Sequence, residues 1–196
     1  MTVRGSADTA LLIQGHQNDL LHEDGRLWSA ALAEHAASRS VVAHIAELIR
    51  HSRQRQHLVV HGLFVNDGQL PNNAALFRGI ASASGVTAGS WGAECLAALA
   101  PEADDVVVHK CRESPFVGTP LDLILRQVGV RRLILAGATT SMGIETAARA
   151  AADLGYHVVV PEDACADPTP QAHDSSIRHT LPALAGVTAT ATLLAS

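Results

Sequence analysis

The sequence predicts a three-layer α/β/α protein with a mainly parallel sheet of six strands. Short apolar runs rich in β-branched residues alternate with longer segments of helical periodicity, which is typical of βα units around a parallel sheet. Several runs are apolar on consecutive residues, as expected of strands that helices cover on both faces. The 196 residues contain no evident linker, low-complexity stretch or repeat. We therefore expect a single domain over residues 1–196.

Six runs are candidate strands, and the last of them is the weakest. Each is short, apolar and followed by polar or small residues. In chain order they are Ala10–Ile13, His57–Leu63, Val106–His109, Leu133–Ala136, His157–Val160 and Val187–Ala191.

A helix with one buried face is predicted before the second strand. Its apolar residues recur at spacings of three and four, which places them on one side of a helix. They are Val41, Val42, Ile45, Leu48 and Ile49.

Three further helices are marked by their ends. Thr119 has the character of an N-cap, Pro120 that of a first helical residue, and Gly129 is placed to stop this helix. The alanine-rich segment 141–154 forms the next helix. Thr169–Pro170 begins the last predicted helix by the same device as Thr119 and Pro120.

Composition restricts the classes of partner. The formal net charge is −5, so we expect no basic surface for nucleic acid and no polybasic membrane anchor. Hydrophobic residues make up 47% of the chain, which favours extensive burial that includes a subunit interface. The expected partners are a small molecule and further copies of the chain, in a dimer or tetramer.

The cysteines and the first apolar run predict a cytoplasmic location. Cys95, Cys111 and Cys165 are odd in number and have no C-x-x-C spacing, which indicates reduced thiols. The run Ala10–Ile13 is too short for the core of a signal peptide or for a membrane span.

The carboxyl ends of the strands are the expected ligand site, because doubly wound sheets bind ligands at that edge. The predicted rim consists of residues around 14–22, 61–68, 110–118, 138–143 and 161–167. It contains Lys110, which is the only lysine in the chain.

Three stretches of this rim resemble the isochorismatase-like (cysteine hydrolase) family. Residues 10–19, ALLIQGHQND, are similar to the family's opening strand ALLVIDMQND. Residues 104–122 are similar to its V-x-K-x-R-x-S-A-F-x-G-T-x-L-D segment, and residues 135–145 to L-x-G-V-A-T-N-V-C-V-E. Segments 89–94 and 155–164 match further landmarks. The resemblance implies a Rossmann-like fold and a homo-oligomer.

The resemblance also implies a catalytic triad, of which one member remains. The family uses Asp, Lys and Cys on carbamoyl compounds, nicotinamide and related amides, while its isochorismatase branch cleaves a vinyl ether. Carried over by position, the aspartate falls on Gly15 and the cysteine on Gly143, and Lys110 alone is retained. Some members work without the cysteine and use the aspartate as general acid, but Gly15 cannot protonate a substrate. We therefore expect cysteine-nucleophile hydrolysis to be absent.

The pocket itself is expected to persist. Backbone amides of the turn into the 141–154 helix favour an oxyanion, since helix N-termini present free N–H groups. Neither Cys165 nor the hydroxyls beside Gly143 carries a sequence signal of activation. The predicted ligand-binding residues are Thr140, Ser141, Met142, Gly143, Arg112, Phe116, His16, Phe64 and Trp91.

No metal or other cofactor is expected. His16, His22 and His61 lie near the rim, and scattered histidines usually have packing or surface roles. Strand alternation directs His16 away from the Gly15 side. The nicotinamidase branch holds metal through an Asp-x-His and a later His after the second strand, and residues 61–67 lack that spacing.

The sequence is compatible with two functions. In the first, the protein is a pseudoenzyme that binds a small molecule, including an anionic one, in the former hydrolase pocket. In the alternative, it is an active hydrolase or lyase with a non-cysteine mechanism centred on Lys110 and backbone amides. The ligand and the pathway are not specified by the sequence.

Overall fold

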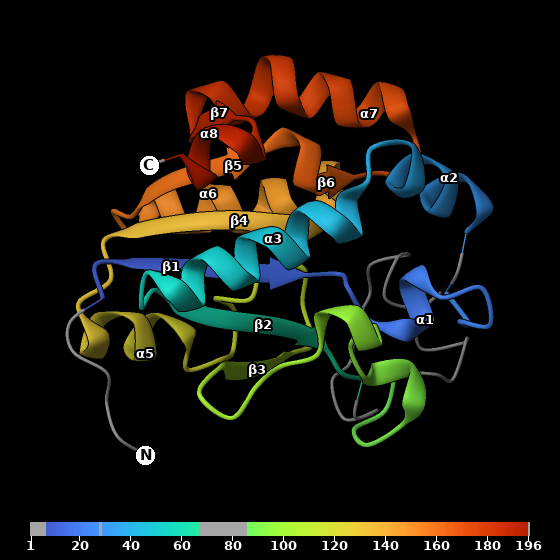
Figure 1. Ribbon diagram of the computed structural model, residues 1–196, viewed down its shortest axis with the longest axis horizontal. Helices are drawn as coiled ribbons and strands as arrows, with labels where there is room; N and C mark the ends of the chain where they lie inside the picture. Colours follow the sequence, from blue (N-terminus) through green and yellow to red (C-terminus); the bar gives the residue numbers. More distant parts are fainter. Residues whose placement is uncertain (1–6, 28, 67–85, 196) are drawn as a thin grey trace.

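The computed structural model describes residues 7–27, 29–66 and 86–195, which build a parallel sheet between helical layers (Figure 1). The sheet order is β3-β2-β1-β4-β5-β7, and a further short strand, β6, pairs with β4. Every pairing between these strands is parallel. This confirms the predicted α/β class. The strands are β1 (Thr9–Gln14), β2 (Leu58–Phe64), β3 (Val106–Lys110), β4 (Arg132–Ala138), β5 (His157–Pro161), β6 (Cys165–Ala166) and β7 (Gly186–Thr188).

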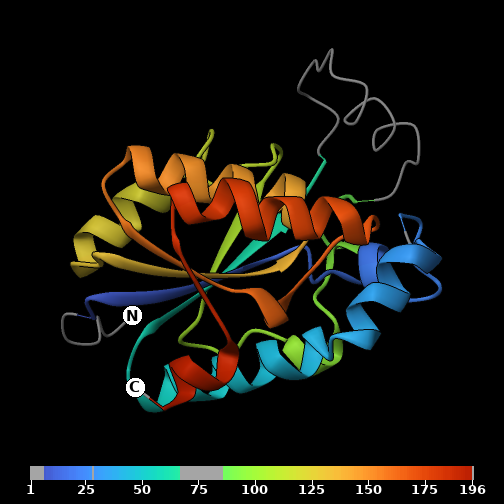
Figure 2. The ribbon, with the colours of Figure 1, turned by 90° about the horizontal axis from the view of Figure 1, so that it is seen from above.

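Helices cover both faces of the sheet. Helices α5, α6 and α7 lie on one face, and α3 and α8 on the other (Figure 2). Within the described ranges no helix has the length and apolar character to cross a membrane. The α-helices are α1 (Asn18–Leu21), α2 (Ala30–Ser38), α3 (Val41–Gln54), α5 (Leu121–Val128), α6 (Glu145–Asp153), α7 (Pro170–Ser175) and α8 (Thr190–Leu194). Shorter turns are η1 (Trp91–Ala93), η2 (Ala97–Leu99), η3 (Thr140–Ile144), η4 (Glu162–Ala164), η5 (Ser176–Thr180) and η6 (Leu181–Ala183).

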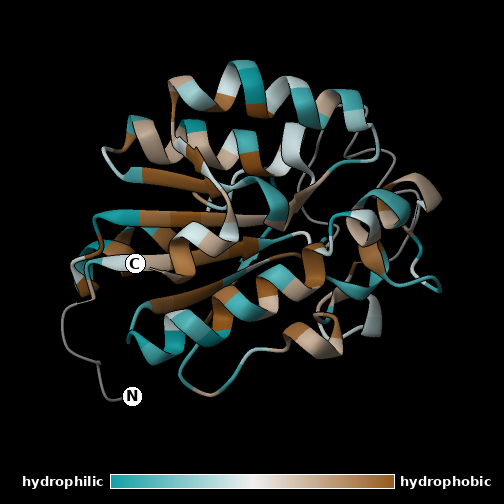
Figure 3. Ribbon diagram, turned by 45° about the horizontal axis from the view of Figure 1, so that its top comes forward, coloured by the Kyte–Doolittle hydropathy of each residue, from teal (hydrophilic) through white to brown (hydrophobic). Residues whose placement is uncertain are grey.

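Two apolar layers explain why the strands are apolar on consecutive residues. In β1, Leu12 packs into the layer beneath α5 and α6, while Leu11 and Ile13 pack into the layer beneath α3. All six residues of β1 are buried. Strands are therefore mostly hydrophobic, whereas the helices also carry hydrophilic stretches (Figure 3). Burial of alternate side chains on both faces stabilises the central strands.

Some predicted helix ends agree with the structure and one does not. Helix α7 begins at Pro170 as predicted, whereas the helix predicted over 141–154 is α-helical only over α6, Glu145–Asp153, after the turn η3. Helix α3 begins at Val41, the first residue of the predicted apolar stripe. Helix α5 begins at Leu121, so Pro120 is its N-cap and not its first residue; the Thr119 hydroxyl accepts a hydrogen bond from the Leu121 amide at 3.2 Å. Gly129 ends this helix with φ at 91°, a left-handed conformation that glycine adopts without strain.

The carboxyl-terminal part differs from the prediction. Strand β7 covers only 186–188, and α8 begins at Thr190, so the expected strand to residue 191 is wrong and a helix follows the one at Thr169–Pro170. The amide and the hydroxyl of Thr190 each donate to Asp163 Oδ1 at 2.8 Å. These two hydrogen bonds to one carboxylate oxygen fix the start of α8, so the chain leaves the sheet after residue 188. The two residues of β6 were too short to predict as a strand.

Candidate functional site

A cavity of about 290 Å³ opens at the carboxyl ends of the strands. It lies where the chain order reverses between β1 and its neighbours β2 and β4, which is the switch point of a doubly wound sheet. All five predicted rim segments contribute, although residues 67 and 68 of the rim lie outside the described residues. The lining consists of Gly15, Gln17, Asp19, Leu20, Leu27, Phe64, Val86, Lys110, Glu113, Ala138, Thr139, Ser141, Met142, Asp167 and Pro168.

Lys110 ends β3 and lines this cavity with a side chain that is 6% exposed. Its ammonium donates to the carbonyl oxygens of Glu113 at 2.8 Å and Arg112 at 3.2 Å, and lies 5.9 Å from the ring centre of Phe64. Burial lowers the pKa of Lys110, while the charge of Glu113 acts to raise it. The result is a strongly held donor, with one ammonium proton left for a ligand.

The backbone at Gly15 leaves no space for a side chain. Gly15 has φ at 66°, and a Cβ built there lies 1.7 Å from the carbonyl oxygen of Ala138. The peptide bond after Ala138 is cis. At Gly143 the same carbonyl oxygen lies 3.3 Å from a built Cβ, a close contact that small shifts relieve. Position 15 thus differs from position 143, because it excludes any side chain in the present backbone.

The turn after β4 is tied to the loop after β6 by one carboxylate. Asp167 Oδ2 accepts hydrogen bonds from the amide of Ser141 at 2.8 Å and from its hydroxyl at 2.7 Å. Its Oδ1 accepts from the amide of Thr169 at 3.2 Å. One of the amides expected to face a ligand is therefore already occupied. Thr140 is fully buried, and its hydroxyl lies 2.8 Å from Nδ1 of His173, so it supports the turn.

Acidic residues of the cavity were missed by sequence reasoning. Asp19, Glu113 and Asp167 all line it. The Asp19 Oδ1 atom accepts a hydrogen bond from the Arg26 amide at 3.1 Å. Its Oδ2 atom is buried and has no hydrogen-bond partner within the described part of the chain. The available signal was the position of each acid, directly after a strand or inside a rim segment.

The predicted site residues divide into two groups. Lys110, Ser141, Met142 and Phe64 line the cavity, together with Gly15. Trp91 lies elsewhere, 47% exposed and edge-on to His22, at 5.0 Å between ring centres. The predicted ligand residues outside the lining are Thr140, Gly143, Arg112, Phe116, His16 and Trp91.

Neither His16 nor Cys165 lines the cavity. Cys165 is fully buried, donates to the Pro161 carbonyl oxygen at 3.4 Å, and has its pKa raised by burial to about 12. His16 is fully buried beside His61 and Cys95. Burial, with the neighbouring His61, lowers the pKa of His16 to about 3, so the ring is neutral at pH 7. Burial also raises the pKa of Cys95 to about 11.

The sequence of this chain is similar to those of known proteins. The isochorismatase domain matches residues 9–192. The chain is 29% identical to the ureidoacrylate amidohydrolase RutB of Variovorax paradoxus over 174 residues, which cover 81% of this chain and 69% of RutB. It is 38% identical over 91 residues to the uncharacterized isochorismatase family protein YecD of Escherichia coli, covering 46% of this chain and only about half, 48%, of YecD.

The fold agrees with the sequence match. The crystal structure of an isochorismatase family protein from Desulfovibrio vulgaris superposes with a TM-score of 0.84 at 28% identity, covering 95% of this chain and 96% of that one. The matched region contains every strand of the sheet and the whole described lining of the cavity. The chain therefore belongs to the isochorismatase family.

Proposed function

We propose that this protein binds a small carbonyl compound in the cavity at Lys110 and does not hydrolyse it by Asp–Lys–Cys catalysis. The observation that carries the proposal is that Lys110 is retained as a hydrogen-bond donor, while the positions of the family's aspartate and cysteine are occupied by glycines. Lys110 lines the cavity, whereas the family's aspartate and cysteine positions, as carried over by resemblance, are Gly15 and Gly143. A donor without the family's aspartate and cysteine binds an oxygen without activating an attack on it by that mechanism.

The charges of the lining favour a neutral ligand over an anionic one. Three acidic residues, Asp19, Glu113 and Asp167, line the cavity together with one basic residue, Lys110. An anion would be attracted by one group and repelled by three, while a neutral amide oxygen accepts from Lys110 without that penalty. The name of the relative RutB, an amidohydrolase, supports an amide-bearing ligand. The volume of about 290 Å³ is at the lower end for ligand pockets, which fits a compact molecule.

Binding is tested with small primary amides, each paired with the carboxylate of the same shape; nicotinamide and nicotinate are the first pair. We expect the amides to raise Tm and to bind at least 10-fold more tightly than their carboxylates in calorimetry. Lys110→Met should abolish this preference while the protein stays folded by circular dichroism. If no amide binds, or if Lys110→Met binds equally well, the proposal is wrong.

A second candidate function is non-covalent catalysis, and Asp19 favours it. Its Oδ2 atom is buried at the cavity without a partner in the described residues, which is a suitable place for a general acid or base. Ammonia release from the amide panel separates the two functions. Turnover that is lost in both Lys110→Met and Asp19→Asn would establish the catalytic alternative. Absence of turnover in the presence of measured binding supports the binding protein.

The proposal includes a cytoplasmic homo-oligomer. The free thiols of Cys95, Cys111 and Cys165 are suited to a reducing compartment. Val117 and Leu123 are 53% and 60% exposed and provide apolar surface for a second copy. Light scattering after size-exclusion chromatography tests the assembly, and a monomer at micromolar concentration would contradict it.

A further inference from the structure

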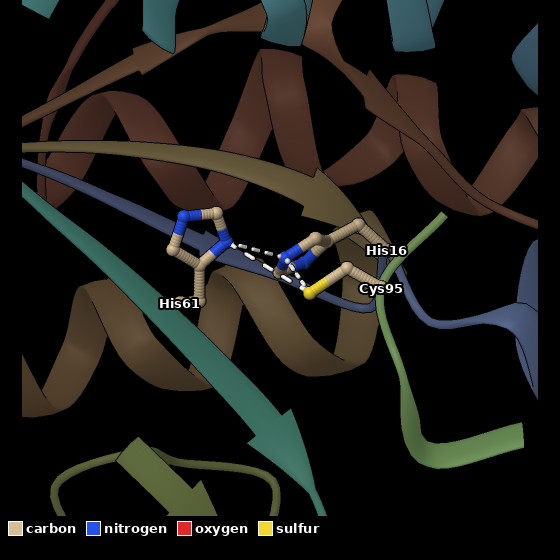
Figure 4. A group of neighbouring side chains, drawn as sticks. All are labelled: His16, His61 and Cys95. Carbon is tan, nitrogen blue, oxygen red and sulfur yellow. Dashed lines mark hydrogen bonds between the residues drawn. The ribbon is translucent and has the colours of Figure 1, made fainter. Parts of the chain in front are cut away.

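A second group of reactive side chains lies outside the cavity, between β1, β2 and the segment before η2. His16, His61 and Cys95 converge there, each from a different segment (Figure 4). Both histidines are fully buried and Cys95 is 8% exposed. None of the three lines the cavity at Lys110, so this group is independent of the proposed function.

The backbone holds these three residues together. The amide of Leu96 donates to the carbonyl oxygen of His16 at 2.9 Å, and the amide of Asn18 donates to that of Glu94 at 2.9 Å. These two bonds flank an antiparallel bridge between Gln17 and Cys95. Cys95 is therefore fixed beside the end of β1, with no flexible loop between the pairing and the thiol.

The three ligand atoms have the separations that one metal ion requires. His16 Nε2 lies 2.9 Å from His61 Nδ1 and 3.3 Å from Cys95 Sγ, and the remaining separation, from Cys95 Sγ to His61 Nδ1, is 4.0 Å. A point equidistant from all three atoms lies about 2.0 Å from each, and moving it slightly out of their plane reaches the ~2.0–2.3 Å of zinc–nitrogen and zinc–sulfur bonds. Small side-chain shifts are enough to complete the geometry.

A carboxylate orients one of the ligands. His61 Nε2 lies 3.4 Å from Asp105 Oδ2, and Arg53 also pairs with that carboxylate. Because Arg53 pairs with Asp105, that carboxylate serves as an acceptor, so His61 donates from Nε2 and directs the lone pair of Nδ1 toward the cluster. Zinc-bound histidines commonly have this outer partner.

We infer that His16, His61 and Cys95 form a site for a thiophilic divalent cation, with Zn²⁺ as the ion that fits. Two imidazoles and one thiolate are ligands that zinc prefers, and hard ions such as Mg²⁺ do not. Zinc binding forms one sulfur and two nitrogen bonds and releases the Cys95 thiol proton to solvent. Cys95 also borders a surface hollow of about 540 Å³ with His22 and Leu63, which gives the ion a route in.

The histidine spacing alone does not predict this group. His16 follows the end of β1, His61 lies in β2, and Cys95 comes from a segment much later in the chain. A hydrogen-bonded core network of the same atoms is the competing interpretation, and it would bind no ion.

The test is a titration of the metal-free full chain with Co²⁺, followed by Zn²⁺. We expect one Co²⁺ per chain to produce a thiolate charge-transfer band and the strong visible bands of tetrahedral cobalt, and Zn²⁺ to displace them. Zn²⁺ at 100-fold above its Kd should raise Tm by about 5–10 °C, whereas Mg²⁺ should not. If stoichiometric Co²⁺ gives no thiolate band at pH 7.5, the inference is wrong.

Matched variants assign the ligands. Cys95→Ser should abolish the thiolate band and His61→Gln should weaken binding more than 10-fold, while Cys111→Ser and His109→Gln should leave both unchanged. Asp105→Asn should weaken binding by about 10–100-fold without changing the band position. Should Cys95→Ser fail to fold, alkylation of the wild-type chain decides: Zn²⁺ must protect Cys95 more than Cys111, as measured by mass spectrometry. A band that persists in folded Cys95→Ser, or equal protection of both thiols, would overturn the assignment.

Discussion

The backbone at Gly15 makes a quantitative prediction about restoring a side chain at the family's aspartate position. Gly15→Ala adds a single Cβ at φ 66°, where that atom would lie 1.7 Å from the Ala138 carbonyl oxygen. The left-handed conformation costs an alanine about 1–2 kcal/mol. Overlap with a backbone atom adds about 1–3 kcal/mol, because the ends of β1 and β4 must move apart. We expect a total loss of about 2–5 kcal/mol in the free energy of unfolding.

Gly118→Ala is the matched control for this measurement. Gly118 has φ at 73°, and a Cβ built there meets no described atom within 4 Å. The control therefore contains the conformational cost and the effect of alanine on the unfolded chain, but no overlap. Urea unfolding followed by circular dichroism gives both free energies, and Tm should differ by about 2–4 °C for each kcal/mol between them. Equal destabilisation by the two substitutions would refute the account of Gly15.

Three further predictions concern the turn and the buried histidines. Gly143→Cys should cost less than about 1 kcal/mol in urea unfolding, because its nearest contact is 3.3 Å, and should release no ammonia from amides, since Gly15 supplies no carboxylate. Asp167→Ala should cost about 2–3 kcal/mol in the same assay by leaving the Ser141 amide unpaired; a loss below 1 kcal/mol would contradict this. His16 and His173 have pKa values lowered by burial to about 3 and about 4, so the unfolded state takes up protons first as pH falls below 6.5. The contribution of these two histidines to stability should therefore be constant above pH 7 and fall by about 2 kcal/mol per histidine at pH 5, and an unchanged urea midpoint from pH 7 to pH 5 would refute it.

The sheet was predictable because strands that are buried on both faces consist of consecutive apolar residues. Each residue of β1 is buried, so the run from Ala10 to Ile13 has no polar interruption. Gly129 was recognisable as a helix end because left-handed conformations favour glycine. Strand β6 was not predictable, since two residues carry no periodicity. The start of α8 depends on Asp163, which is 27 positions away from Thr190, and local patterns contain no such information.

The cavity was predicted by position and only partly by residue. Strand ends share one edge of a parallel sheet, which is why the predicted residues Lys110 and Phe64 both line the cavity. Asp19 and Asp167 were not assigned to the site, because their roles depend on loops that fold back over the sheet. His16 was predicted among the ligand-binding residues, although strand alternation directed it away from the Gly15 side; it lies outside the cavity lining, beside His61. The alternation was the better guide.

Gly15 and Gly137 together show that the absence of a side chain at position 15 involves the backbone of both strands. A Cβ at Gly137 would lie 1.8 Å from the Gln14 carbonyl oxygen, as one at Gly15 would lie 1.7 Å from that of Ala138. The ends of β1 and β4 thus approach each other at two reciprocal points that exclude side chains. Substituting aspartate at position 15 alone would separate the strands and displace the cavity wall at Ala138. An aspartate side chain there requires a different path of the β1 end, so we expect Gly15→Asp alone to give no amide hydrolysis.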